Sequence, residues 1–301
     1  MNASPLMHLD GAPFATQFDR RPFKIRHELA NHPLFALPRL VQLARSLDSP
    51  VLYFRGNHSI NQVDEGPGRK RTFVDRGLER PELSVEETIA QIESCNAWMQ
   101  LRDVAREPEY RALLGHLVEE FRVRSEPVAP GLSAPRADIF ISSPGATTPF
   151  HLDEEHNFLL QIRGTKKMSI ADGARSEVLD PESLRSFFLG NGELARYSEH
   201  LEKHSEHVDL APGDGVHIPS CHPHWVQNGP EVSISFGILW FSDVTAKRRN
   251  LYRVNEWLMR AGLKPSAPGE RPLSDALKSL PVTVKRRLLR SVRRRGSRLV
   301  S

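Results

Sequence analysis

TTPFHLDEEHNFLLQIRGTKKMSI, residues 147–170, is the most informative stretch of this sequence. It holds a His-x-Asp pair, His151 and Asp153, followed by a predicted pair of strands whose polar positions do not suit an ordinary core. In an extended segment, side chains two residues apart project from the same face. His151 and Asp153 can therefore bind one metal ion together.

A third metal ligand has to come from a distant part of the chain. The segment PGDGVHIPSCHPHWVQN, residues 212–228, contains three histidines between short extended runs. His224, 71 residues after Asp153, is the best candidate, and His217 and His222 are its rivals. Two imidazoles and one carboxylate leave coordination positions open, which favours a non-haem Fe(II) site over a closed structural zinc site.

Lys166 is the second unusual position. Strand alternation in KKMSI places Lys166 on the same face as Met168 and Ile170, so its ammonium is predicted to point into an apolar interior. A buried ammonium needs an anion, and no acidic residue alternates into place in this stretch. A bound carboxylate would satisfy it, as in a 2-oxoglutarate site. The alternative is a surface lysine whose ammonium stays in water.

Four patterns together carry a family resemblance: TPFHLDEEHNFLLQIRGTKK, PGDGVHIP, HPHWVQN and EVSISFGILW. They resemble the cupin-like JmjC hydroxylases related to the asparaginyl hydroxylase factor inhibiting HIF, over about residues 139–241. The resemblance implies an Fe(II)- and 2-oxoglutarate-dependent dioxygenase with a double-stranded β-helix (jelly-roll, cupin) core. Such an enzyme would hydroxylate a C–H bond of a protein side chain, a peptide or a small molecule, with succinate and CO2 as co-products.

The resemblance also implies roles for individual residues, carried over position by position. The iron ligands would be His151, Asp153 and His224. The contacts to 2-oxoglutarate would come from Lys166, Thr148 and Asn157, and the segment AWMQL, with Trp98 and Gln100, would line the pocket.

The chain departs from the family pattern at two places near the proposed site. Cys221, His222 and Pro223 stand where the family often has aromatic residues before the last histidine, and Ser235 and Gly237 replace an Asn and an aromatic residue on the next strand. The identity of the substrate is therefore open, including the choice between hydroxylation and demethylation.

Composition limits the class of protein. The chain has 301 residues and 39% hydrophobic content, enough for one catalytic unit with helical additions. Its two cysteines, Cys95 and Cys221, describe no disulfide framework, so a reducing cytoplasm is expected. The N-terminus does not have the pattern of a signal peptide, and no segment is apolar for long enough to predict a membrane span.

The net charge of +4 is unevenly distributed. Residues 285–298 hold eight basic residues and no acidic one, which leaves −4 for the rest of the chain. This tail could contact nucleic acid, acidic lipid headgroups or an acidic partner, or do nothing specific. It supports an alternative function, a non-catalytic cupin-type regulatory or binding module.

Patterning predicts a mainly β protein with flanking helices, in three regions. Residues 1–135 are expected to form a mixed, largely helical region, with a helix after Pro38 and a capping box at Ser84 and Glu87. Residues 136–243 hold the short strands of a sandwich or barrel, interrupted by a helical insert at about 172–207. Residues 244–301 are expected to be helical and to end in the basic tail, with Trp257 on an apolar helix face and a possible homodimer contact.

Overall fold

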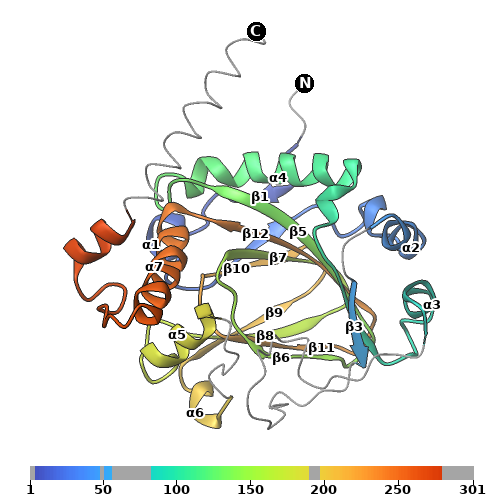
Figure 1. Ribbon diagram of the computed structural model, residues 1–301. Coiled ribbons are helices and arrows are strands. Elements are labelled where there is room, and N and C mark those ends of the chain that lie inside the picture. Colours follow the sequence, from blue (N-terminus) through green and yellow to red (C-terminus); the bar gives the residue numbers. More distant parts are fainter. Residues whose placement is uncertain (1–3, 48–50, 56–82, 190–196, 280–301) are drawn as a thin grey trace.

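The computed structural model describes residues 4–47, 51–55, 83–189 and 197–279 and consists of two antiparallel sheets with helices around them (Figure 1). The large sheet has the strand order β1-β2-β10-β7-β12-β5-β4-β3, and the small sheet has the order β6-β11-β8-β9. The strands are β1 (Met7–His8), β2 (Phe23–His27), β3 (Val51–Arg55), β4 (Ala97–Leu101), β5 (Ser133–Ser142), β6 (Thr147–His151), β7 (His156–Arg163), β8 (Lys166–Ala171), β9 (Ser205–Leu210), β10 (Asp214–Ile218), β11 (His224–Asn228) and β12 (Ser233–Phe241). The helices are α1 (Phe14–Gln17), η1 (Pro33–Phe35), α2 (Leu37–Ser46), α3 (Val85–Ala90), η3 (Val104–Arg106), α4 (Pro108–Ser125), α5 (Pro181–Leu189), α6 (Glu199–Glu202) and α7 (Asp243–Arg260).

Strands β5 to β12 confirm the predicted jelly-roll core. β5, β7, β10 and β12 belong to the large sheet, and β6, β8, β9 and β11 belong to the small one. The chain therefore passes back and forth between two facing sheets, as in cupins. β1 to β4, from the N-terminal region, extend the large sheet on both edges, so this sheet runs across the expected boundary at residue 135. The three-region division itself stays a prediction.

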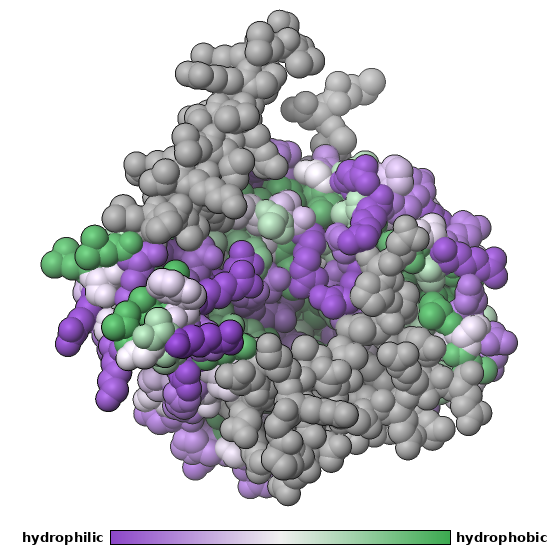
Figure 2. Space-filling model, viewed as in Figure 1, coloured by the Kyte–Doolittle hydropathy of each residue, from purple (hydrophilic) through white to green (hydrophobic). Residues whose placement is uncertain are grey.

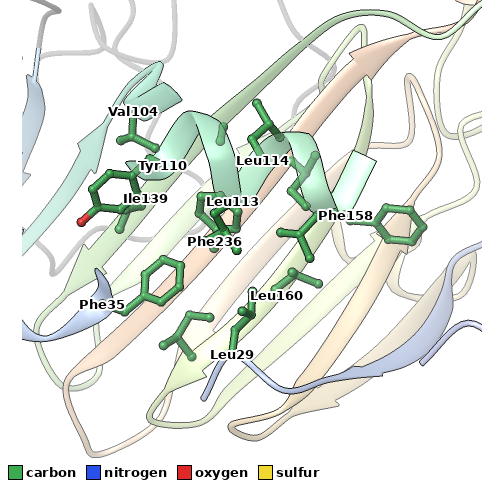
Figure 3. Close-up of a cluster of buried hydrophobic side chains, with 14 of the residues drawn as sticks. Leu29, Phe35, Val104, Tyr110, Leu113, Leu114, Ile139, Phe158, Leu160 and Phe236 are labelled. Carbon is green, nitrogen blue, oxygen red and sulfur yellow. The ribbon is translucent and has the colours of Figure 1, made fainter. Parts of the chain in front are cut away.

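The main apolar core lies on the outer face of the large sheet, where α4 and the N-terminal segments pack (Figure 3). Phe158 and Phe236, from neighbouring strands, are fully buried there, and Phe121 of α4 lies 4.5 Å from Trp240 between ring centroids. Because strand side chains alternate, the residues between these apolar ones face the small sheet. Because the main apolar core lies on the outer face, the inner face of the large sheet can hold polar residues.

The space between the two sheets has an apolar part and a polar part. Leu159 and Val216 of the large sheet meet Met168, Ile170 and Val226 of the small sheet in a second buried cluster. Ser235 lies in the same interior and donates a hydrogen bond to Oε1 of Gln161 at 2.7 Å. The space between the sheets therefore contains hydrogen-bonded polar side chains as well as an apolar cluster.

Most local predictions are confirmed. The helix after Pro38 is α2, and the capping box at Ser84 and Glu87 begins α3. Trp257 lies on α7, in the region predicted to be helical, with 69% of its surface exposed, whereas Leu251 of the same helix is buried. Figure 2 shows hydrophobic surface at the left edge of the molecule, where Figure 1 places the C-terminal helices.

Other sequence-based predictions concern absences or residues outside the described ranges. Both cysteines are free thiols. No helix in the described ranges is long and apolar enough to cross a bilayer. Part of the helical insert and the basic tail lie outside the described residues, as do residues 56–71, whose polar, glycine-containing sequence predicts a loop.

The turn between β7 and β8 depends on a glycine. Gly164 has φ +67°, and a Cβ there would lie 2.4 Å from the carbonyl oxygen of Val232. We predict that Gly164→Ala lowers the free energy of unfolding by more than the ~1–2 kcal/mol of a left-handed residue alone. Gly145→Ala is the matched control, because Gly145 has φ +69° but open space around it. Urea denaturation of both variants measures the difference, and equal losses would contradict the prediction.

Candidate metal centre

His151, Asp153 and His224 come together at one end of the small sheet. Their ligand atoms all lie within 4.8 Å of one another. Nε2 of His224 is 3.9 Å from Oδ2 of Asp153, and the two imidazole centroids are 4.2 Å apart. His224 is buried, whereas His151 and Asp153 are partly exposed, so the cluster is reachable from one side. The structure thus brings together the three side chains predicted to converge.

Both imidazoles are oriented by their own backbone. Nδ1 of His151 lies 2.8 Å from the carbonyl oxygen of Pro149, and Nδ1 of His224 lies 2.9 Å from the carbonyl oxygen of His222. A carbonyl oxygen only accepts hydrogen bonds, so each Nδ1 carries the hydrogen. Each Nε2 then presents its lone pair to the cluster, which is the arrangement that metal-binding histidines require.

An irregularity in the pairing of β6 with β11 sets the direction of the ligands. His224 pairs with His151 and Val226 pairs with Thr148, so β6 holds one extra residue between the two pairs. Such a bulge changes the side-chain alternation of the longer strand. As a result, both Thr148 and His151 can face the interior although they are three residues apart.

The turn that carries Asp153 is fastened to the segment before His224. The backbone N–H of Cys221 donates to the carbonyl oxygen of Asp153 at 2.8 Å. Oγ of Ser220 donates to the carbonyl oxygen of Glu154 at 2.7 Å. Cys221 itself is buried and has φ 59°, a left-handed conformation. The two ligand-bearing segments, 71 residues apart in sequence, are therefore joined by backbone contacts.

The rival third ligands point elsewhere. His217 is fully buried on the outer face of the large sheet, stacked on Phe18 at 4.4 Å and Phe23 at 4.8 Å between centroids. Nε2 of His222 lies 3.2 Å from the carbonyl oxygen of Arg20. Neither joins the cluster of potential metal ligands within the described part of the chain.

The carboxylate of Asp153 is held in its charged form. Burial alone would raise its pKa, but the net shift is downward because His224, His151 and Arg136 favour the negative charge. Nδ2 of Asn157 adds a long contact of 3.5 Å to Oδ2 of Asp153. A carboxylate that stays ionised is ready to bind a cation.

Lys166 lies inside the protein, as alternation predicted. Only 7% of its surface is exposed, and no residue in the described ranges forms a hydrogen bond or ion pair with its ammonium. Burial lowers the pKa of Lys166 to about 7. An uncompensated ammonium is unfavourable in such a place unless an anion binds.

The other predicted pocket residues occupy the same interior with different partners. Nε1 of Trp98 donates to Oγ1 of Thr148 at 2.9 Å, which leaves the hydroxyl hydrogen of Thr148 able to bond elsewhere. Nε2 of Gln100 donates to the buried carboxylate of Asp138 at 2.9 Å. Oδ1 of Asn157 is buried and has no hydrogen-bond partner.

Asn228 was missed by the sequence-based prediction, whereas Gly237 was noted only as a departure from the family pattern. Asn228, on the strand of His224, is buried with both atoms of its amide unpartnered. Its even spacing from His224 is a signal that could have identified it. At Gly237, a Cβ would lie 3.0 Å from Cε2 of Phe140 and 3.8 Å from Oδ1 of Asn157. A glycine there keeps space open beside Asn157.

These residues fit an iron ion with 2-oxoglutarate. The donor set of two imidazoles and one carboxylate is the facial triad of non-haem Fe(II) oxygenases. The ammonium of Lys166, which no described residue pairs, is a donor that a carboxylate of this ligand could engage.

Comparisons with known proteins give a family match and several similar solved structures. The model of the family described as "Cupin-like domain" matches residues 51–247. Solved structures of Escherichia coli YcfD are similar. One, described as a ribosomal oxygenase, has 15% identity over 90% of this chain with a TM-score of 0.48, and one in complex with cobalt and 2-oxoglutarate has 16% identity over 90% with a TM-score of 0.49. The chain spans 64% of the length of both structures.

We predict that the cluster binds one divalent metal ion. Replacing His224 with Ala should weaken Mn(II) binding by more than the 10–100-fold typical of losing an outer-shell partner. The control is His200→Ala, because His200 belongs to another segment. There its ring centroid lies 4.9 Å from that of His204. The Mn(II) affinities are measured by isothermal titration calorimetry under nitrogen. Circular dichroism verifies that each variant is folded. Equal affinity in the two variants would contradict the assignment.

Proposed function

This chain belongs to the Cupin-like domain family, and from that premise we propose that it is an Fe(II)- and 2-oxoglutarate-dependent oxygenase of the JmjC hydroxylase type. The observation that carries the proposal is the unpaired ammonium of Lys166, buried between the same two sheets as the cluster of His151, Asp153 and His224. A metal site alone would suit many proteins. A metal site with a buried cation deeper in the same interior suits a bidentate ligand that ends in a carboxylate.

In this proposal the triad holds Fe(II) and the interior residues hold 2-oxoglutarate. When bound together, iron and 2-oxoglutarate supply oxygen activation, so that 2-oxoglutarate and O2 give succinate and CO2 while one oxygen atom enters a C–H bond of the substrate. The chain's own task is positioning and the exclusion of competing chemistry. Lys166 would pair with the distal carboxylate, with the hydroxyl of Thr148 as a second donor.

The remaining contacts would orient these groups. Trp98 fixes the hydroxyl of Thr148 by donating to its oxygen. Asn157 lies beside Asp153 and would contribute its amide near the metal. Gln100 donates a hydrogen bond to Asp138, so its role would be to line the pocket. Asp138 in turn is paired with Arg136, which stabilises the charge of Asp153.

The proposal covers the substrate, the partners and the cellular location only in general terms. The side chain to be hydroxylated, in a protein, a peptide or a small molecule, would reach the cluster from the exposed side of His151 and Asp153. A cytoplasmic location and a homodimer through the C-terminal helices stay predictions. The basic tail lies outside the described residues, so its contact with nucleic acid also stays a prediction, as does the binding-module alternative.

The direct test is turnover. With Fe(II), ascorbate, O2 and 2-oxoglutarate, we expect the protein to release succinate, measured by NMR, and Asp153→Ala to release none. The Mn(II)-loaded protein should also bind 2-oxoglutarate without any other substrate. The proposal is wrong if the loaded protein neither binds 2-oxoglutarate nor forms succinate. Salt-sensitive DNA binding without turnover would instead favour the binding module.

The pKa of Lys166 makes a separate prediction about pH. The ammonium form is the one that pairs with a carboxylate, and in the free protein it is lost as the pH rises through about 7. The dissociation constant of 2-oxoglutarate at saturating Mn(II) should therefore rise above pH 7, by up to about tenfold per pH unit. Lys166→Met should bind weakly at every pH.

Lys166→Arg, the conservative variant, tests whether loss of the positive charge causes the pH dependence. Arginine stays protonated throughout this range, so Lys166→Arg should show a flat profile between pH 6.5 and 9. Titration calorimetry in two buffers would also detect uptake of a proton by the wild type on binding above pH 7. A wild-type profile as flat as that of Lys166→Arg would show that this lysine does not anchor the ligand.

A further inference from the structure

Asn228 occupies the interior wall at the level of Lys166. On β11, alternation puts His224, Val226 and Asn228 on one face, and Val226 belongs to the buried cluster between the sheets. Asn228 is 5% exposed. It lies four residues from His224, about 13 Å along the strand at ~3.3 Å per residue. It is therefore too far along β11 to belong to the metal cluster.

Its amide is buried without any partner. Neither Nδ2 nor Oδ1 of Asn228 has a hydrogen bond. A buried primary amide normally satisfies both its donor and its acceptor atoms, because an unmade hydrogen bond is unfavourable. The local turn does not need the side chain. The backbone N–H of Asn228 donates to the carbonyl oxygen of Ala146, and that of Gly229 donates to the carbonyl oxygen of Thr165.

The residue directly across the strand pair is Lys166. Asn228 of β11 and Lys166 of β8 are register partners, and both face the space between the sheets. Directly opposite side chains in an antiparallel pair have Cβ atoms about 4.5–5.5 Å apart. Two neighbouring polar groups, one cationic and one amide, thus share an interior that gives neither of them a partner among the described residues.

The buried side chain of Gln161, on the large sheet, does not share this property. Nε2 of Gln161 donates to the carbonyl oxygens of Arg163 and Gly164 and to Oγ of Ser233, and Oε1 of Gln161 accepts from Ser235. That network is closed. Among the described residues, the amide of Asn228 has no hydrogen-bond partner, and burial is the one influence on the ammonium of Lys166.

We propose that Asn228 is a positioning residue for the carboxylate that Lys166 anchors. Its Nδ2–H donates to one carboxylate oxygen, while its Oδ1 accepts a hydrogen bond from the ammonium and directs the remaining N–H bonds toward the ligand. This inference rests on the proposed function for the identity of the ligand. The adjacency of Asn228 and Lys166 does not, so the two can be tested separately.

Two substitutions separate positioning from a structural role. Asn228→Asp places a carboxylate of the chain beside Lys166, so it should raise the melting temperature and weaken 2-oxoglutarate binding at least about 100-fold by competing for the ammonium. Asn228→Ala should weaken binding about tenfold, the order expected for one hydrogen bond to a charged group. Mn(II) affinity should stay unchanged in both, because Asn228 is remote from the cluster.

The control is Asn255→Ala. Asn255 of α7 is also 5% exposed, and its Nδ2 donates to the carbonyl oxygen of Ser266, away from the interior. It should lose stability and keep its affinity for 2-oxoglutarate. Binding is measured by calorimetry with Mn(II)-loaded protein, and melting by circular dichroism.

The outcomes distinguish the two proposals. If Lys166→Met loses binding and Asn228→Ala stays within twofold of the wild type, Asn228 has no positioning role. If the wild type binds no 2-oxoglutarate, the proposed function fails. In that case the melting temperature of Asn228→Asp still decides the pairing, since a variant no more stable than the wild type would contradict it.

Discussion

The antiparallel pairing of β11 between β6 and β8 is the constraint on which the rest depends. Through β6, it sets His224 against His151, and through β8, it sets Asn228 against Lys166. One five-residue strand therefore carries both ends of the proposed site, the metal at its start and the anion at its end. A shift by one residue would turn every one of these side chains to the opposite face. The bulge in β6 and the backbone bonds to the turn at Asp153 oppose such a shift.

The two faces of the large sheet have different roles, which explains how the protein tolerates polar residues between its sheets. The outer face buries aromatic side chains such as Phe158, Phe236 and Trp240 against α4 and the N-terminal segments. That burial provides the main hydrophobic stabilisation. The inner face then needs only a small apolar cluster and can hold Lys166 and the two unsatisfied asparagines, Asn157 and Asn228. Groups that are unfavourable in an empty interior become favourable partners for a ligand.

The sequence predicted what short-range periodicity encodes. His151 and Asp153 lie two apart on one segment, and side-chain alternation in β8 places Lys166 on the same inner face as Met168 and Ile170. Thr148 faces inward only because of a bulge, which depends on pairing with a strand almost eighty residues away. The two-residue strand β1, and β2 with it, form through contacts that no local pattern specifies. Asn228 was missed although its spacing from His224 is even, because an unpartnered buried amide is recognised only from the contacts of the folded chain.

The way in which the two imidazoles are held has a consequence for evolution. Each ring is fixed by the carbonyl oxygen two residues before it, so no neighbouring side chain is needed to select the ring nitrogen that faces the cluster. Backbone oxygens cannot be lost by substitution. The side chains of neighbouring residues, including Cys221 and His222, therefore need not support the imidazoles. A lineage with this centre can change its outer pocket, and with it the molecules it accepts, while the chemistry at the middle is inherited intact.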